Sequence, residues 1–167
     1  MNNNLELIKN KILSQNDKRL DNILSVLRFF DKKIIFTNGV FDILHKGHID
    51  YLSKAADCGD VLIVGLNTDS SVKRLEKGNS RPIQDEYSRA MILAALRFVD
   101  YVIFFDQDTP YDLIGQVQPD VLVKGADYKP EDIVGYDIVK AKGGEIRTIE
   151  FLQGFSTSQI EKKIKSS

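Results

Sequence analysis

The chain lacks the residues and runs on which several classes of protein depend. It has 167 residues and a single cysteine, Cys58, which excludes a disulfide framework and a thiolate zinc site. Its longest apolar runs, such as 61–66 and 91–96, are far shorter than the ~20 residues of a membrane-spanning helix. The segment 1–6 has neither the basic nor the apolar region of a secretory signal. We therefore expect a cytoplasmic domain that does not enter a membrane.

The chain also lacks an excess of charge of either sign. The formal net charge is −1, which argues against a protein whose main partner is nucleic acid. A hydrophobic fraction of 43% with 28% charged residues is typical of a soluble globular chain. The length suits one domain with a full core.

Apolar runs and helical patterns alternate along most of the chain. Residues 1–30 are predicted to form a helical N-terminal extension, with a break near 14–17. The predicted strands are Lys33–Thr37, Val61–Asn67, Tyr101–Phe105, Val121–Lys124 and Glu145–Glu150. Helices are expected between them, over about 47–58, 85–97, 110–117 and 136–142, with a last one near 157–165.

This alternation predicts an α/β fold: a Rossmann-like open sheet of five mostly parallel strands, with helices on both faces. In such sheets ligands bind beyond the carboxyl ends of the strands. The segments that follow the strands should therefore converge on one site, and they are 38–48, 67–81, 106–110, 125–130 and 153–158.

The two histidines of the chain, His45 and His48, lie three residues apart with Gly47 between them. They follow the apolar run 34–36 and precede an amphipathic helix. A strand that feeds a helix presents free backbone N–H groups and the positive end of a helix dipole. The pattern favours a polyphosphate site; the alternative is that both are ordinary polar residues of a loop and a first helical turn.

Several segments carry a resemblance to a known family. Gly39–His48 resembles the signature of the cytidylyltransferase-like nucleotidyltransferase superfamily. Further segments resemble the adenylyltransferases of ADP-heptose synthesis, and they are Asn67–Leu75, Ser80–Pro82, Asp120–Pro130 and Gly154–Ser158. The resemblance covers about residues 33–165 and implies a nucleotidyltransferase domain over 31–167.

The resemblance implies a reaction and its partners. Members of that family transfer AMP from ATP to D-glycero-β-D-manno-heptose 1-phosphate, for lipopolysaccharide core synthesis. In many bacteria the domain is fused to a heptose kinase; 167 residues leave no room for one, so a separate kinase is expected. The apolar faces of the N-terminal helices would pack on the core or on a second subunit, and we expect a homo-oligomer.

Candidate site residues follow from the resemblance and from the convergent segments. The catalytic candidates are His45, His48 and Lys73. The candidates for binding ATP are Asn38, Gly39, Val40, Phe41, His45, Gly47, His48, Arg89, Lys124, Gly125, Asp127, Ser156 and Thr157. The candidates for binding the sugar phosphate are Asp42, Asn67, Asp69, Lys73, Arg81 and Tyr128.

The chemistry expected of these residues is electrostatic. Fixed donors stabilise the negative charge that grows on the α-phosphate and on the leaving pyrophosphate. No covalent intermediate is needed, because the attacking phosphate oxygen is already an anion. Mg²⁺ is expected as a cofactor that arrives with ATP and is held chiefly by phosphates and water, without a protein metal site.

Several candidates have a purely structural alternative. Asp42 precedes a helix and is more often a cap there. Ser156 or Thr157 could likewise cap the last helix, a role compatible with the phosphate contact that we favour for them. A strand-end lysine such as Lys124 reaches water, and the cluster around Lys73 is most often a solvated loop. Arg89 either reaches the nucleotide or pairs with an acidic neighbour, Asp85 or Glu86.

Two other functions stay open from the sequence. One is a cytidylyltransferase acting on glycerol 3-phosphate or a similar phosphorylated alcohol. Such enzymes carry an arginine three residues before the last motif's glycine, where this chain has Phe151. The other is a non-catalytic nucleotide-binding module on the same fold. A degenerate module should have lost a histidine or the hydroxyl pair, and both are present.

Overall fold

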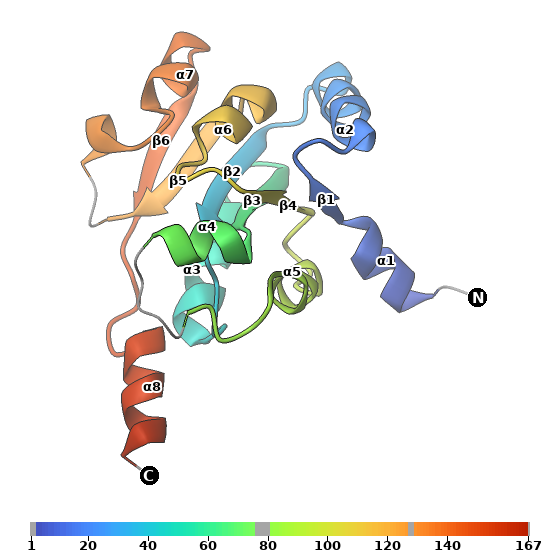
Figure 1. Cartoon of the computed structure of the whole chain (residues 1–167). Helices are drawn as coiled ribbons and strands as arrows, with labels where there is room; N and C mark the ends of the chain where they lie inside the picture. Colours follow the sequence, from blue (N-terminus) through green and yellow to red (C-terminus); the bar gives the residue numbers. More distant parts are fainter. Residues whose placement is uncertain (1–2, 76–80, 127–128, 167) are drawn as a thin grey trace.

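The structure is a computed structural model that describes residues 3–75, 81–126 and 129–166. Its centre is a sheet of six strands in the order β1-β4-β3-β2-β5-β6, and every adjacent pair is parallel. The strands are β1 (Ile12–Ser14), β2 (Ile34–Gly39), β3 (Val61–Asn67), β4 (Tyr101–Phe105), β5 (Val121–Gly125) and β6 (Glu145–Ile149). Figure 1 shows this sheet between two layers of helices.

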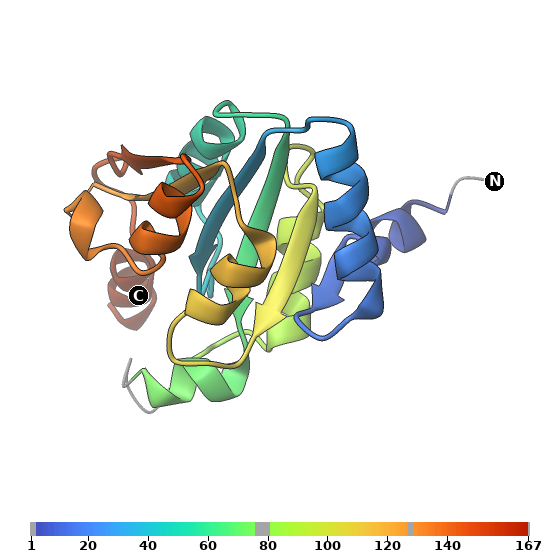
Figure 2. The ribbon, with the colours of Figure 1, turned by 90° about the horizontal axis from the view of Figure 1, so that it is seen from above.

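Alternation along each strand builds a hydrophobic core on both faces of the sheet. Ile35 of β2 belongs to one core, whereas its neighbours Ile34 and Phe36 belong to the other. The first core is covered by α1 (Asn4–Asn10), α3 (Lys46–Ala56) and α5 (Glu86–Ala94). The second is covered by α2 (Lys18–Phe29), α6 (Tyr111–Val117) and α7 (Tyr136–Ala141). Figure 2 shows the two layers from above.

Three further elements complete the described fold. They are α4 (Asp69–Arg74), the 3-10 turn η1 (Pro130–Asp132) and the C-terminal helix α8 (Thr157–Lys165). Helix α8 lies outside both layers, below the sheet in Figure 1. Within the described residues, no helix combines the length and the apolar character needed to cross a bilayer.

The expected fold class is confirmed, with one correction: the sheet has six strands rather than five. The additional strand, β1, lies within the N-terminal segment that was expected to be helical. Ile12 and Leu13 are buried, and β1 pairs with β4 from Val102 to Phe104. Three residues are too few for a periodic signal, so only the neighbouring strand explains why they are extended. The expected break is real, because Asp17 caps α2.

The order of the strands defines where a ligand can bind. From β2 the chain builds outward through β3 to β4, and it then returns to build β5 and β6 on the other side of β2. The order therefore reverses between β2 and β5, and a crevice forms beyond their carboxyl ends. Asn38 and Gly39 end β2, and Lys124 and Gly125 end β5.

Candidate active site

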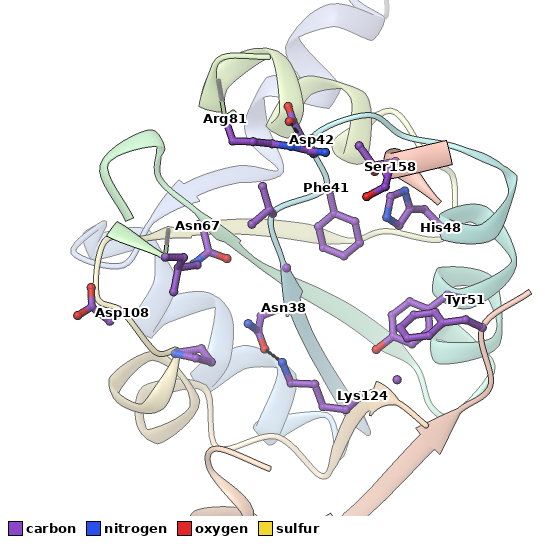
Figure 3. Close-up of a pocket in the computed structure, with 17 residues that line it drawn as sticks. Asn38, Phe41, Asp42, His48, Tyr51, Asn67, Arg81, Asp108, Lys124 and Ser158 are labelled. Atoms are coloured by element: carbon purple, nitrogen blue, oxygen red, sulfur yellow. Dashed lines mark hydrogen bonds and ion pairs between the residues drawn. The ribbon is translucent and has the colours of Figure 1, made fainter. Parts of the chain in front are cut away.

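A cavity of about 590 Å³ opens at this reversal point. Figure 3 shows its lining, which comes from β2, β3 and β5, from the loops that follow strands, and from α3 and α8. The lining residues are Asn38, Gly39, Val40, Phe41, Asp42, His48, Tyr51, Asn67, Leu75, Arg81, Asp108, Pro110, Lys124, Gly125, Phe151, Thr157 and Ser158. A space of this size suits a nucleotide-sized ligand.

The histidine pair lies where α3 begins. His45 is the N-cap residue of α3, and its side chain makes no capping hydrogen bond. Its ring stacks on that of His48, with the centroids 3.8 Å apart, and the edge of Phe41 lies against His48 at 5.3 Å. His48 lines the cavity, whereas His45 does not. Both Nδ1 atoms are buried without a hydrogen-bond partner among the described residues.

Burial controls the charge of these rings. Desolvation by burial is the main cause that lowers the pKa of His48 to about 4, and the electrostatic effect of the nearby His45 adds to it. A backbone hydrogen bond at Ile43 opposes the shift. Burial also lowers the pKa of His45. Both imidazoles are therefore neutral at pH 7 in the free protein, and each carries one N–H donor.

Gly47 is required by the packing of this turn. A Cβ atom there would lie 3.0 Å from Cε1 and 3.1 Å from Nδ1 of His45, and 3.3 Å from the Cβ of Phe155. Any larger residue would displace the stacked ring or the segment before α8. Glycine thus allows the histidine pair and the C-terminal segment to approach each other.

Asp42 connects two loops of the site. Its side chain is 2% exposed and accepts hydrogen bonds from the backbone N–H groups of Ile83 and Gln84, both at 2.9 Å. Arg81 Nη1 donates to the same carboxylate at 3.1 Å. Asp42 therefore does not cap α3; it holds the 81–84 loop against the histidine motif. It also lines the cavity.

The ends of β2 and β5 form another wall. Lys124 Nζ donates to Asn38 Oδ1, as the dashed line in Figure 3 shows. Tyr51 shares a hydrogen bond of 2.8 Å with the buried Thr37. The ring of Phe151 lies 5.7 Å from that of Tyr51 and is 54% exposed. An exposed aromatic face next to Gly125 suits a flat ligand group.

The opposite wall is formed by the ends of β3 and β4. Asn67 Nδ2 donates to Ser71 Oγ at 2.9 Å, which fixes the orientation of that amide. Asp108 accepts from Arg74 Nε at 2.8 Å at the rim. Figure 3 places Asn67 and Asp108 on the side of the cavity away from His48.

Arg89 is buried behind the site. Its side chain is 1% exposed, and it donates to the carbonyl oxygens of Gln84, Val40 and Asn67. It also forms an ion pair of 2.7 Å with Asp69. Neither proposed acidic neighbour is its partner, and it does not line the cavity. Arg89 thus connects the loops around the cavity, and its expected contact with ATP stays a prediction.

The structure brings together eleven of the candidate residues around the cavity. They are Asn38, Gly39, Val40, Phe41, Asp42, His48, Asn67, Arg81, Lys124, Gly125 and Thr157. The candidates that do not line it are His45, Gly47, Asp69, Lys73, Arg89 and Ser156. Lys73 is exposed on α4, and Ser156 caps α8 through Gln159 N. Asp127 and Tyr128 lie outside the described residues.

Six lining residues were not among the candidates. They are Tyr51, Leu75, Asp108, Pro110, Phe151 and Ser158. Asp108 and Pro110 lie in the segment 106–110, which was expected to converge on the site. Their position in the sequence could therefore have indicated them, although their residue types did not. Ser158 belongs to the last motif. Within the described part of the chain, no group of three His, Cys, Asp or Glu side chains is placed to hold a metal ion.

This fold and site define a nucleotidyltransferase of the cytidylyltransferase-like class. The model of that family, described as cytidylyltransferase-like, matches residues 36–167, and the chain belongs to it. Among curated proteins, it is 57% identical to the bifunctional protein HldE of Campylobacter jejuni over 148 residues. It is 53% identical to the bifunctional protein HldE of Wolinella succinogenes over 157 residues.

These matches cover most of this chain but a minor part of the relatives. The Campylobacter match takes in 89% of this chain and 31% of the relative, and the Wolinella match 94% and 32%. The chain thus spans about a third of the length of these curated relatives.

Two solved structures share the fold. One is a lipopolysaccharide core biosynthesis protein from Thermoplasma volcanium, with TM-score 0.60, 28% identity, and coverage of 72% of this chain and 99% of that chain. The other is a pantoate-beta-alanine ligase from Francisella tularensis, with TM-score 0.61, 20% identity, and coverage of 92% and 77%. The second likeness concerns the fold alone.

Proposed function

We propose that the chain transfers AMP from ATP to D-glycero-β-D-manno-heptose 1-phosphate and releases pyrophosphate. The observation that carries the proposal is that His48, at the N-terminus of α3, lines the same cavity as the first residues of α8. Two helix N-termini then face a single space, an arrangement suited to a polyphosphate. The similarity to HldE proteins and to a lipopolysaccharide core biosynthesis protein supports the choice of sugar.

The reaction is a displacement at phosphorus. The phosphate oxygen of the sugar forms a bond to the α-phosphorus of ATP. The bond from that phosphorus to the oxygen bridging to the β-phosphate breaks, and pyrophosphate leaves with the electron pair. Negative charge grows on the α-phosphate and on pyrophosphate, where His48 and the backbone N–H groups that open α8 act as fixed donors.

The walls of the cavity suggest which part of each substrate they bind. The aromatic wall with Phe151 and Gly125 suits the purine. Cytidylyltransferases carry an arginine at the position of Phe151, and the apolar ring here favours adenine instead of cytosine. The opposite wall, with Asn67 and Asp108, offers polar groups to sugar hydroxyls. Arg81 lines the cavity beside Asp42, as Figure 3 shows, and its N–H groups suit a phosphate.

Mg²⁺ belongs to this proposal as a companion of ATP. Asp42 is already occupied by two backbone N–H groups and Arg81, and Asp108 by Arg74. Both carboxylates are thus engaged by donors, and the ion is held chiefly by phosphates and water. When bound, it would neutralise charge on the triphosphate.

The direct test is pyrophosphate release with ATP and with CTP against a panel of sugar and alcohol phosphates. We expect turnover with ATP and the heptose 1-phosphate and little with CTP. Activity only with CTP and glycerol 3-phosphate would establish the cytidylyltransferase alternative. Nucleotide binding without turnover with any acceptor would establish a non-catalytic module. The separate kinase, the homo-oligomer and the cytoplasmic location remain predictions.

A further inference from the structure

Helix α8 contributes to the cavity but has little packing of its own. Its first residues, Thr157 and Ser158, line the cavity, yet none of the residues of α8 is buried. Figure 1 shows it below the sheet, outside the helical layers. A two-turn helix without a buried face gains little stability from itself, so side-chain contacts must hold its position.

One such contact is an ion pair between α8 and Arg81. Arg81 Nη2 donates to Oε1 of Glu161, which follows Thr157 by one helical turn. The other nitrogen, Nη1, donates to Asp42 at 3.1 Å. The side chains are mostly buried: Arg81 is 15% exposed, Asp42 2% and Glu161 25%. Such shielding makes the pair stronger than an exposed ion pair.

The chain of contacts runs from the histidine motif to α8. Backbone N–H groups fix Asp42, Asp42 fixes one arm of Arg81, and the other arm holds Glu161. A guanidinium has five N–H donors, and these two contacts leave others for the cavity that Arg81 lines. Arg81 can therefore hold α8 and meet a phosphate at the same time.

We propose that Glu161 is a positioning residue for the nucleotidyl transfer. It holds the Arg81 guanidinium and the first turn of α8 together, so that Thr157 and Ser158 face the phosphates beside His48, next to which Ser158 lies in Figure 3. The inference rests on the proposed function of the same site. A second contact, Lys46 over the ring of Phe155 at 5.3 Å, ties the segment before α8 to α3.

The opposite role for Glu161 makes a different prediction. Its carboxylate could instead compete with substrate phosphate for Arg81, because both are anions on one guanidinium. Removing a competitor tightens ATP binding, whereas removing a positioning residue weakens it. The sign of the change in the KM for ATP therefore separates the two.

The experiment compares Glu161→Gln, Glu161→Ala and Glu161→Asp with the unmodified chain. We expect the KM for ATP to rise about tenfold in Glu161→Ala, equivalent to about 1.4 kcal/mol, with kcat changed less than the KM. Glu161→Gln should show a smaller rise, because a neutral acceptor is weaker. Glu161→Asp should restore part of the affinity. Lys162→Gln, an exposed single-charge change on the same helix, is the matched control.

A second measurement does not depend on turnover. Amide hydrogen exchange in the ligand-free chain should become faster at residues 157–161 in Glu161→Ala and remain unchanged in α3. A lower KM for ATP, or unchanged KM and exchange, overturns the proposal. If the unmodified chain shows no turnover with any substrate, the proposed function fails, whereas the exchange result still tests the role of Glu161 in holding α8.

Discussion

The imidazole rings of His45 and His48 stack face to face at 3.8 Å, with 23° between their planes. Two neutral rings tolerate this contact, whereas two imidazolium ions at such a distance repel each other. Desolvation by burial is the leading cause of the lowered pKa of both histidines. Neither buried Nδ1 has a hydrogen-bond partner among the residues that the structure describes. Both rings are thus neutral at pH 7 in the free protein.

The first prediction concerns the pH dependence of stability. The pKa of His48 is about 4 in the folded state, whereas an unperturbed histidine has about 6.5. Between these values the unfolded chain binds a proton that the folded chain does not, so stability is full above about pH 6.5 and falls as pH drops towards 4. Over this pH range His48 accounts for a loss of up to about 3 kcal/mol in the free energy of unfolding.

Urea unfolding at pH values from 7 to 4.5 measures this effect. In His48→Asn the fall in unfolding free energy over this range should be clearly smaller than in the unmodified chain. Equal falls in the two proteins would show that His48 is not held neutral by folding.

The second prediction concerns turnover. His48→Ala should lower kcat at saturating ATP by about 100-fold or more, as expected for loss of one fixed donor to a developing anion. Pyrophosphate release measures it, and Lys54→Gln, an exposed change on the same helix, serves as control. A normal kcat combined with a raised KM would remove His48 from the transition state.

The third prediction distinguishes a structural role of Arg89 from a direct contact with ATP. Arg89→Met leaves Asp69 and three carbonyl oxygens without their donor, so the free energy of unfolding should fall by about 3–5 kcal/mol. Denaturant unfolding measures the loss, and the exposed Arg97→Met should change it little. An Arg89→Met protein of normal stability that binds ATP poorly would restore the direct contact with nucleotide.

The fourth prediction tests the aromatic wall. Phe151→Ala should weaken ATP binding by about 5- to 150-fold, the range expected from the loss of about 1–3 kcal/mol of base stacking. Calorimetry with ATP and CTP measures the change, and Phe29→Ala, 80% exposed on α2, is the control. Unchanged affinity for ATP would place the purine elsewhere in the cavity.

Much of the fold could be predicted because it depends on local patterns. The strands at 61–67 and 101–105 are continuous apolar runs, and the helices between strands have a clear helical period. The parallel order then follows from the alternation of the two. Strand β1 could not be predicted, because Ile12 and Leu13 are extended only through their pairing with β4.

The site divides in the same way. The histidine pair and Gly47 could be singled out from their spacing, and the hydroxyl residues before and in α8 from the family resemblance, since each set belongs to one short segment. Arg89 could not be assigned, because its partners at Val40, Asn67 and Asp69 are 20 to 49 residues away. The same holds for Phe151, which lines the cavity and contacts the ring of Tyr51, a residue far along the chain.

By itself, then, the sequence determined the alternation of strands and helices, the edge of the sheet where ligands bind, and the histidines that open α3. Hydrophobic periodicity and helix termini are properties of contiguous residues, so they can be recognised without a fold. Only the tertiary structure decided which charged side chains face the cavity and which, like Arg89, serve buried carbonyl groups. That choice depends on burial and on partners far along the chain, and these exist only once the sheet has assembled.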